Sequence, residues 1–215
     1  MKPLSWMCCI LLLSGVAGPA AWADTDRATA LRELASDDVR TRQLGVAHLA
    51  ESGEMADVPP LLSALDDEDA SVRAGSERAI WAIWSRSGDV EIDRLFAEGA
   101  EHLAYRRLPE SIEVFTRIIQ RKPDFAEGWN KRATALYLAG DLDASAADCD
   151  EVLKRNPSHF GALSGYGLIS LQRGDMEAAL GYFERALALN PNMPGVRANI
   201  EAIRSTLTRR GRRET

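Results

Sequence analysis

Prolines recur with a 34-residue period in the second half of this 215-residue chain: Pro123, Pro157 and Pro191 are equally spaced. Each of them follows a Lys or an Asn and precedes a short polar residue. A sequence that repeats with a long fixed period folds as a row of similar units, because no single unit can bury its apolar face alone. The period therefore restricts this part of the chain to a stacked repeat architecture.

The residues inside each period also agree in kind. Large apolar and small residues fall into fixed columns, and within a unit their spacing of three and four is that of an amphipathic helix. Aromatic residues make up only 7% of the chain, which disfavours an all-β fold. The aligned columns include Leu95, Trp129 and Leu163; Gly99, Ala133 and Gly167; and Phe115, Cys149 and Phe183.

A turn is expected in the middle of each unit. The dipeptide Gly-Asp begins at Gly140 and again at Gly174, while the first unit has Arg106 in place of the glycine. Gly adopts the left-handed conformation that ends a helix, and Asp caps the N-terminus of the next one. Because proline stops the second helix, each unit is predicted to be a hairpin of two helices.

Residues 92–192 resemble three tetratricopeptide repeats, a family of 34-residue helix hairpins that stack into a right-handed superhelix. The resemblance rests on the period, the small-residue and aromatic columns, and the closing proline. The chain is also similar to a set of exported bacterial tetratricopeptide proteins of unassigned function that carry a Trp-Asn-Lys-Arg-Ala-Thr helix, here residues 129–134. The departures from the family pattern are His102, Leu136 and Ser170, where Tyr is favoured, and Arg132, where Leu is favoured.

The N-terminal half contains shorter periodic stretches. The pattern from Leu62 to Ile83 resembles a HEAT-type repeat, a family in which a turn carboxylate pairs along the stack with an Arg of the second helix. The resemblance assigns these roles to Arg40 and Arg73 with Asp37 and Asp69. The matching positions of Val39 and Val72 set the expected register of two units.

These elements are expected to form one continuous all-α, right-handed α-solenoid, since each repeat must bury its face on a neighbour. Trp81 and Trp84, three positions apart on a predicted helix, are expected to fill the junction between the two repeat types. The expected organisation is a signal peptide at 1–23, HEAT-like repeats at 24–87, three tetratricopeptide repeats at 88–192, a capping helix at 193–208 and a basic tail at 209–215.

The two ends of the chain have their own patterns. Lys2, an apolar run that is interrupted at Gly18, and Ala21-Trp22-Ala23 are typical of a secretory signal cleaved after Ala23, which predicts a periplasmic protein without a membrane-spanning segment. The capping helix carries an apolar stripe, followed by four basic residues that either are solvated or contact a membrane surface or an acidic partner. The stripe is Val196, Ile200, Ile203 and Leu207; the basic residues are Arg209, Arg210, Arg212 and Arg213.

The sequence contains no recognisable catalytic or metal-binding motif. His48, His102 and His159 lie far apart, without the spacing of a metal site, and no phosphate loop or nucleophile motif is present. Asp148 and Asp150 are expected to be solvated, and Cys149, the only cysteine left after signal cleavage, to lie in the core. The prediction is a protein that is not an enzyme and needs no cofactor or metal; a net charge of −6 argues against nucleic acid as a partner.

The resemblance implies a concave groove lined by the first helix of each repeat. Helix phase places six candidate peptide-binding residues there: Phe96, Asn130, Lys131, Thr134, Tyr137 and Leu171. The columns that would bind chaperone carboxylates instead hold Phe96, Ala100, Gly161 and Gly165, so that use is set aside. The expected function is a protein-binding adaptor in a cell-envelope assembly; a self-associating structural protein and an enzyme are the alternatives, and the oligomeric state is left open.

Overall fold

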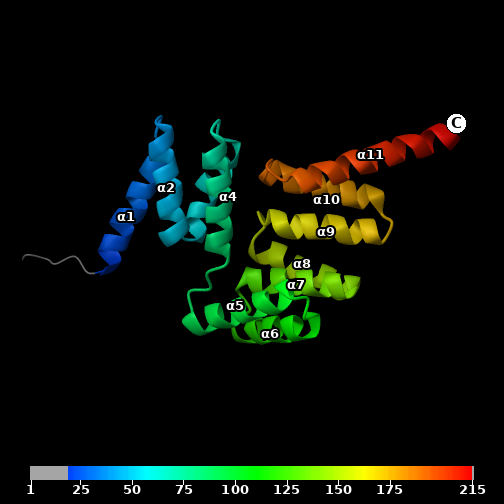
Figure 1. Ribbon diagram of the computed structural model, residues 1–215, viewed down its shortest axis with the longest axis horizontal. Coiled ribbons are helices and arrows are strands. Elements are labelled where there is room, and N and C mark those ends of the chain that lie inside the picture. Colours follow the sequence, from blue (N-terminus) through cyan, green and yellow to red (C-terminus); the bar gives the residue numbers. More distant parts are fainter. Residues whose placement is uncertain (1–18, 215) are drawn as a thin grey trace, which may run out of the picture.

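The computed structural model describes residues 19–214, with side chains for residues 27–210. Every element in this range is helical, which confirms the predicted all-α fold (Figure 1). Residues 1–18 of the predicted signal peptide lie outside the described range, and none of the described helices is long and apolar enough to cross a bilayer. The elements are α1 (Pro19–Leu34), α2 (Val39–Ser52), η1 (Met55–Asp57), α3 (Val58–Ser63), η2 (Ala64–Asp66), α4 (Ala70–Trp84), α5 (Val90–Ala104), α6 (Leu108–Arg121), α7 (Ala126–Ala139), α8 (Leu142–Arg155), α9 (Phe160–Gln172), α10 (Met176–Leu189) and α11 (Pro194–Glu214).

The 34-residue units are the predicted helix hairpins, α5 with α6, α7 with α8 and α9 with α10. Gly140 and Gly174 turn the chain with φ angles of 87° and 80°, and Asp141 and Asp175 cap the helices that follow. Arg106 adopts the same left-handed conformation, with φ of 58°. All three units therefore use one turn geometry, although only two of them have the residue that takes it without steric cost.

Small residues in the first helix of each hairpin admit a large one from the second. A Cβ atom on Gly99 would lie 2.9 Å from the ring of Phe115, which is too close for an unshifted side chain. The third hairpin repeats this pairing of a glycine with a phenylalanine. The second hairpin has Ala133 and Cys149, which share one core cluster. The smaller Cys side chain leaves room for the extra methyl group.

The N-terminal repeats have a shorter period than the two valines predicted. Asp38 and Asp69 are both N-caps, of α2 and α4 respectively, and their spacing is two positions less than that of Val39 and Val72. Arg42 and Arg73, four positions after each cap, both donate hydrogen bonds to backbone carbonyl oxygens of the preceding turn. The two helices are equivalent when aligned at these caps and arginines.

This register changes the residues that pair along the stack. Arg42 Nε lies 2.8 Å from a carboxylate oxygen of Asp67, and the pair is almost fully buried. The expected roles of Arg40 and Asp37 are therefore wrong, since both are exposed. Asp69 caps α4 and accepts a hydrogen bond from Gln43 instead. The resemblance placed the first arginine two positions too early.

The two sets of repeats do not continue as one stack. In Figure 1, α1, α2 and α4 run upright, whereas α9 and α10 run across the view. The core around α4 includes Phe160, at the start of α9. Asn190 Nδ2 donates to Glu77 at 3.0 Å, and Asn192 Nδ2 donates to the carbonyl of Leu65 at 2.7 Å. The N-terminal repeats thus pack against the turns that join one hairpin to the next.

The last helix, α11, covers the final hairpin and then continues beyond it (Figure 1). Val196, Ile200 and Ile203 are buried against α10, as the capping pattern predicted. The helix does not end at residue 208 but extends to Glu214, so residues 209–214 of the predicted basic tail belong to the same helix.

Candidate functional site

A buried carboxylate joins α7 to the turn before α9. The side chain of Glu127, in the first turn of α7, is fully buried. Its oxygens accept hydrogen bonds from His159 Nε2 at 2.9 Å and Asn130 Nδ2 at 3.1 Å, and Lys131 Nζ lies 3.1 Å away. These two hydrogen bonds and the ion pair with Lys131 offset the cost of burying the Glu127 carboxylate.

The hydrogen bonds of His159 assign its tautomer. Nδ1 accepts a hydrogen bond from the backbone N–H of Ala162, so the proton must be on Nε2, which donates it to Glu127. Burial by itself raises the pKa of Glu127, but the hydrogen bond from His159 and the charge and hydrogen bond of Lys131 outweigh it, and the pKa is lowered. Glu127 is therefore a carboxylate at neutral pH.

Two tryptophans of α4 pack on the hydrogen-bonded pair of Glu127 and His159. This contact confirms their predicted role at the junction between the N-terminal repeats and the hairpins. The indole of Trp84 stacks on the ring of His159, with a centroid distance of 4.3 Å, and Trp81 meets the same ring edge-on at 5.5 Å. Lys131 Nζ lies 5.5 Å from the centroid of the Trp81 ring. The buried pair is thus covered by aromatic rings from the N-terminal repeats.

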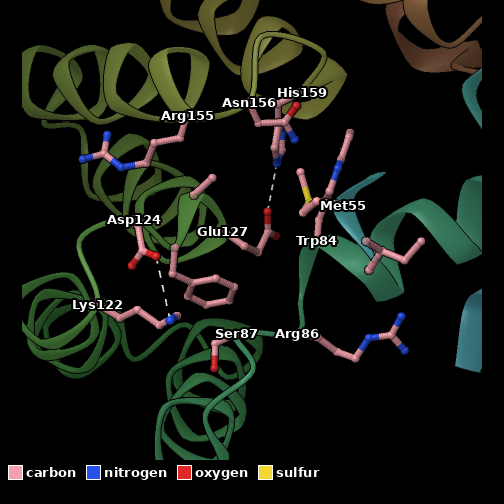
Figure 2. Close-up of a pocket in the computed structure, with 13 residues that line it drawn as sticks. Met55, Trp84, Arg86, Ser87, Lys122, Asp124, Glu127, Arg155, Asn156 and His159 are labelled. Atoms are coloured by element: carbon pink, nitrogen blue, oxygen red, sulfur yellow. Dashed lines mark hydrogen bonds and ion pairs between the residues drawn. The ribbon is translucent and has the colours of Figure 1, made fainter. Parts of the chain in front are cut away.

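A cavity of about 340 Å³ lies at this junction. Figure 2 shows the Glu127–His159 hydrogen bond in it, with Trp84 and Met55 from the N-terminal repeats on the side facing His159. No group of three or more metal-ligating side chains gathers here or elsewhere in the described part of the chain. The lining residues are Met55, Ile83, Trp84, Arg86, Ser87, Lys122, Asp124, Phe125, Ala126, Glu127, Arg155, Asn156 and His159.

A second cavity, of about 150 Å³, lies between α7 and α9. Thr134 and Tyr137 face it from α7, and Ser164 and Leu168 from α9. Gly165 also lines the cavity. A Cβ atom at this position would lie 3.6 Å from the Cys149 sulfur, so a larger side chain would fill part of the space that glycine leaves empty. The surface combines hydroxyl groups with apolar groups, as expected for a site that binds a peptide side chain and its backbone.

The structure brings three of the six predicted groove residues together. Asn130, Thr134 and Tyr137 all line the α7–α9 cavity. Lys131 instead lies at the junction, and both it and Asn130 are engaged by Glu127. The other two lie apart: Phe96 packs on Phe115 and Phe125, and Leu171 packs on the core of the last hairpin.

The prediction missed the Glu127–His159 pair because its partners are far apart in the sequence, in two different repeats. One sequence signal was available. In the 34-residue alignment His159 occupies the column of Phe125 and Met193, so a polar side chain takes an otherwise apolar, inward position. A polar residue in such a column needs a partner inside the protein, and Glu127 supplies it.

Arg132 explains one departure from the family pattern. Its guanidinium makes two hydrogen bonds of 2.8 Å to the carboxylate of Asp148, on α8. Asp148 is only 4% exposed, so the expectation that it is solvated is wrong. An ion pair here replaces the contact that an apolar residue would make.

Cys149 lies in the core, as expected, with 2% of its surface exposed. Burial and the neighbouring charge of Asp148 raise the pKa of its thiol to about 12. A pKa this high keeps the thiol protonated at neutral pH, and the protonated form is a poor nucleophile.

Comparison with known proteins agrees with this architecture. A family model described as tetratricopeptide repeat matches residues 96–154 and 139–194. A TPR repeat-containing protein of Rhizobium etli is 35% identical over 108 residues, or 50% of this chain and 53% of the relative. The cytochrome c-type biogenesis protein CycH of Pseudomonas aeruginosa is 24% identical and covers 83% of this chain and 49% of its own. The chain thus spans about half the length of these relatives.

Solved structures show the same fold. The first TPR of Spaghetti (RPAP3), bound to the HSP90 peptide SRMEEVD, superimposes with a TM-score of 0.52 at 22% identity. The match covers 54% of this chain and 93% of that one. The sequence identity is low, so the match supports the hairpin stack and not the ligand.

Proposed function

Residues 96–194 belong to the tetratricopeptide repeat family, and from this premise we propose that the protein is an adaptor that binds an extended peptide segment of a partner protein between α7 and α9. The observation that carries the proposal is the α7–α9 cavity. It is lined by Thr134, Tyr137, Ser164 and Leu168, and it would accept one apolar side chain while the hydroxyl groups bind the peptide backbone.

The partner differs in kind from a chaperone C-terminus. The first TPR of Spaghetti, which has a similar fold, binds the peptide SRMEEVD, in which three of the last four residues are acidic. Here Lys131 and Asn130, two of the predicted peptide-binding residues, already bind the protein's own Glu127. The proposed ligand is therefore selected by an apolar side chain rather than by a terminal carboxylate.

The proposed location is the periplasm. The predicted signal at residues 1–23 supports it, and CycH, which aligns with 83% of this chain, is named for the biogenesis of another protein. An adaptor in a cell-envelope assembly fits both observations. We propose no catalytic role, since the α7–α9 cavity places hydroxyl groups beside apolar ones without a base near them.

Site-specific photocrosslinking in intact cells tests the peptide proposal. A photoreactive amino acid at position 134, in the cavity, should crosslink one defined partner segment, whereas the same residue at the exposed position 110 on α6 should not. Tyr137→Ala combined with Leu168→Ser should abolish the crosslink while the helical circular dichroism is unchanged. Equal crosslinking from both positions, or a product made only of two copies of this chain, would reject the proposal.

A further inference from the structure

We propose that the junction cavity is a second binding site, for a small carboxylic acid with an apolar body. It is separate from the α7–α9 cavity, because it lies between α4 and the turns that precede α7 and α9 (Figure 2). At about 340 Å³ it has the size of a small-molecule pocket.

Two buried hydrogen-bond donors line this cavity without a partner in the described part of the chain. They are Nε1 of Trp84 and Nδ2 of Asn156, and the residues are 4% and 5% exposed. A buried N–H group without an acceptor is costly, so native proteins rarely leave two of them at one place. Both N–H groups would be satisfied by acceptor oxygens of a ligand inside the cavity.

The next repeat shows which acceptor suits this position. Asn190 is the equivalent of Asn156 one repeat later and has the same role in its turn: each side-chain oxygen accepts a hydrogen bond from the backbone N–H two positions further on. Asn190 Nδ2, however, donates to a carboxylate oxygen of Glu77 at 3.0 Å. Asn156 has no such carboxylate partner and lines the cavity instead. The carboxylate of a ligand would accept the hydrogen bond from Asn156 Nδ2, as Glu77 accepts that from Asn190.

The charges around the cavity favour an anion. Glu127 is already bound by His159 and Lys131, so its charge is compensated. Arg86 donates only to the backbone carbonyl oxygens of residues 50, 51 and 53, and no carboxylate pairs with it among the described ion pairs. Among the described ion pairs, the Nζ of Lys122 has a single carboxylate partner, Asp124, at the long distance of 3.9 Å. Positive charge therefore remains available to a ligand.

The rest of the lining is apolar. Ile83, Phe125 and Met55 share the cavity with the ring of Trp84. These side chains would bury the body of the ligand while the two donors bind its carboxylate. The site joins α4 to the repeats, so occupancy would also stabilise the contact between the two halves of the chain.

The indole N–H resonance of Trp84 in ¹⁵N-labelled protein reports on this site directly. Titration with phenylacetate at pH 7 should shift that resonance in a saturable manner, whereas 2-phenylethanol, which lacks the carboxylate, should not. The indole of Trp129 is an internal control, since it already donates to the carbonyl of Pro123 at 3.0 Å. No saturable shift, or the same shift with both probes, would overturn the proposal.

Two variants with opposite expectations sharpen the test. Asn156→Asp keeps the acceptor for the Ser158 N–H and replaces the donor by a negative charge, so phenylacetate affinity should fall by at least about tenfold. Asp124→Asn, at an exposed position, removes a carboxylate beside Lys122 and should strengthen binding. If Asn156→Asp does not fold, Trp84→Phe is the second variant, because it retains an aromatic ring but lacks the N–H donor. Its affinity for phenylacetate, measured by calorimetry, should fall by a similar factor. Unchanged affinity in the folded variant overturns the proposal.

Discussion

His159 Nε2 lies 2.9 Å from Oε2 of Glu127, a residue of the preceding repeat, and neither side chain is exposed. The hydrogen bond connects two consecutive repeats at the place where Trp84 of α4 stacks on the imidazole ring. One polar pair therefore holds three parts of the chain together: α7, the start of α9 and the end of α4. The stability of the junction should depend on this pair more than on any exposed ion pair.

Replacement of Glu127 should destabilise the protein strongly. Glu127→Ala leaves the donors of His159 and Asn130 without an acceptor inside the fold and should lower the free energy of unfolding by about 3–5 kcal/mol. Glu127→Gln, which retains one acceptor, should lower it by about 2 kcal/mol. Urea denaturation followed by circular dichroism measures both. Glu110→Ala, at an exposed position of α6, is the control; equal losses at positions 110 and 127 would contradict the assigned role.

The same carboxylate should make the stability depend on pH. Because the pKa of Glu127 is lower in the folded protein than its ordinary value of 4.5, the unfolded chain binds more protons between the two values. The stabilisation from Glu127 is complete above pH 4.5 and is lost as the pH falls through the folded pKa. The difference in unfolding free energy between wild type and Glu127→Gln should therefore shrink as the pH is lowered from neutral to below 4.5. A difference that stays constant or grows would show that the carboxylate is not stabilised by folding.

The first turn should tolerate a stabilising substitution. Arg106 has φ of 58°, where a Cβ atom is unfavourable, and the equivalent residues of the next two units are glycines. Arg106→Gly should raise the free energy of unfolding by roughly 0.5–1 kcal/mol, as relief of the steric cost exceeds the added flexibility of the unfolded chain. Arg107→Gly, at the next position with φ of −81°, should give no gain in the same thermal and urea measurements. Equal effects at both positions would rule out the conformational explanation.

The hairpins could be predicted from sequence because their information is local and repeated three times. The proline period, the Gly-Asp turns and the small-residue columns each depend on contacts within one unit or with the next. The N-terminal register does not follow from Val39 and Val72, because the two valines occupy different places in their helices. The residues that set the register are the caps Asp38 and Asp69, which lie closer together in the sequence than the two valines do.

The arrangement of the two halves depends on contacts that have no periodic signal. Asn190 meets Glu77, and Asn192 meets the Leu65 carbonyl, although more than half of the chain separates the members of each pair. The sequence indicated the tryptophans as junction residues, but not that the junction would lie at the turns between hairpins. The candidate groove was located in part, since Thr134 and Tyr137 do face one cavity, while the buried acceptor for Lys131 was not foreseen.

The second hairpin offers a test of the pairing between small and large columns. Cys149→Phe alone should destabilise the protein by about 1–3 kcal/mol, because the ring would collide with Ala133, where the other hairpins have glycine. Adding Ala133→Gly should recover most of this loss, so the double-mutant cycle should show a favourable coupling of at least about 1 kcal/mol. The phenyl ring would also reduce the α7–α9 cavity, which both positions line, so the rescued protein should fold normally yet crosslink its partner less from position 134. Additive effects in urea denaturation would mean that the two columns do not pack as a pair.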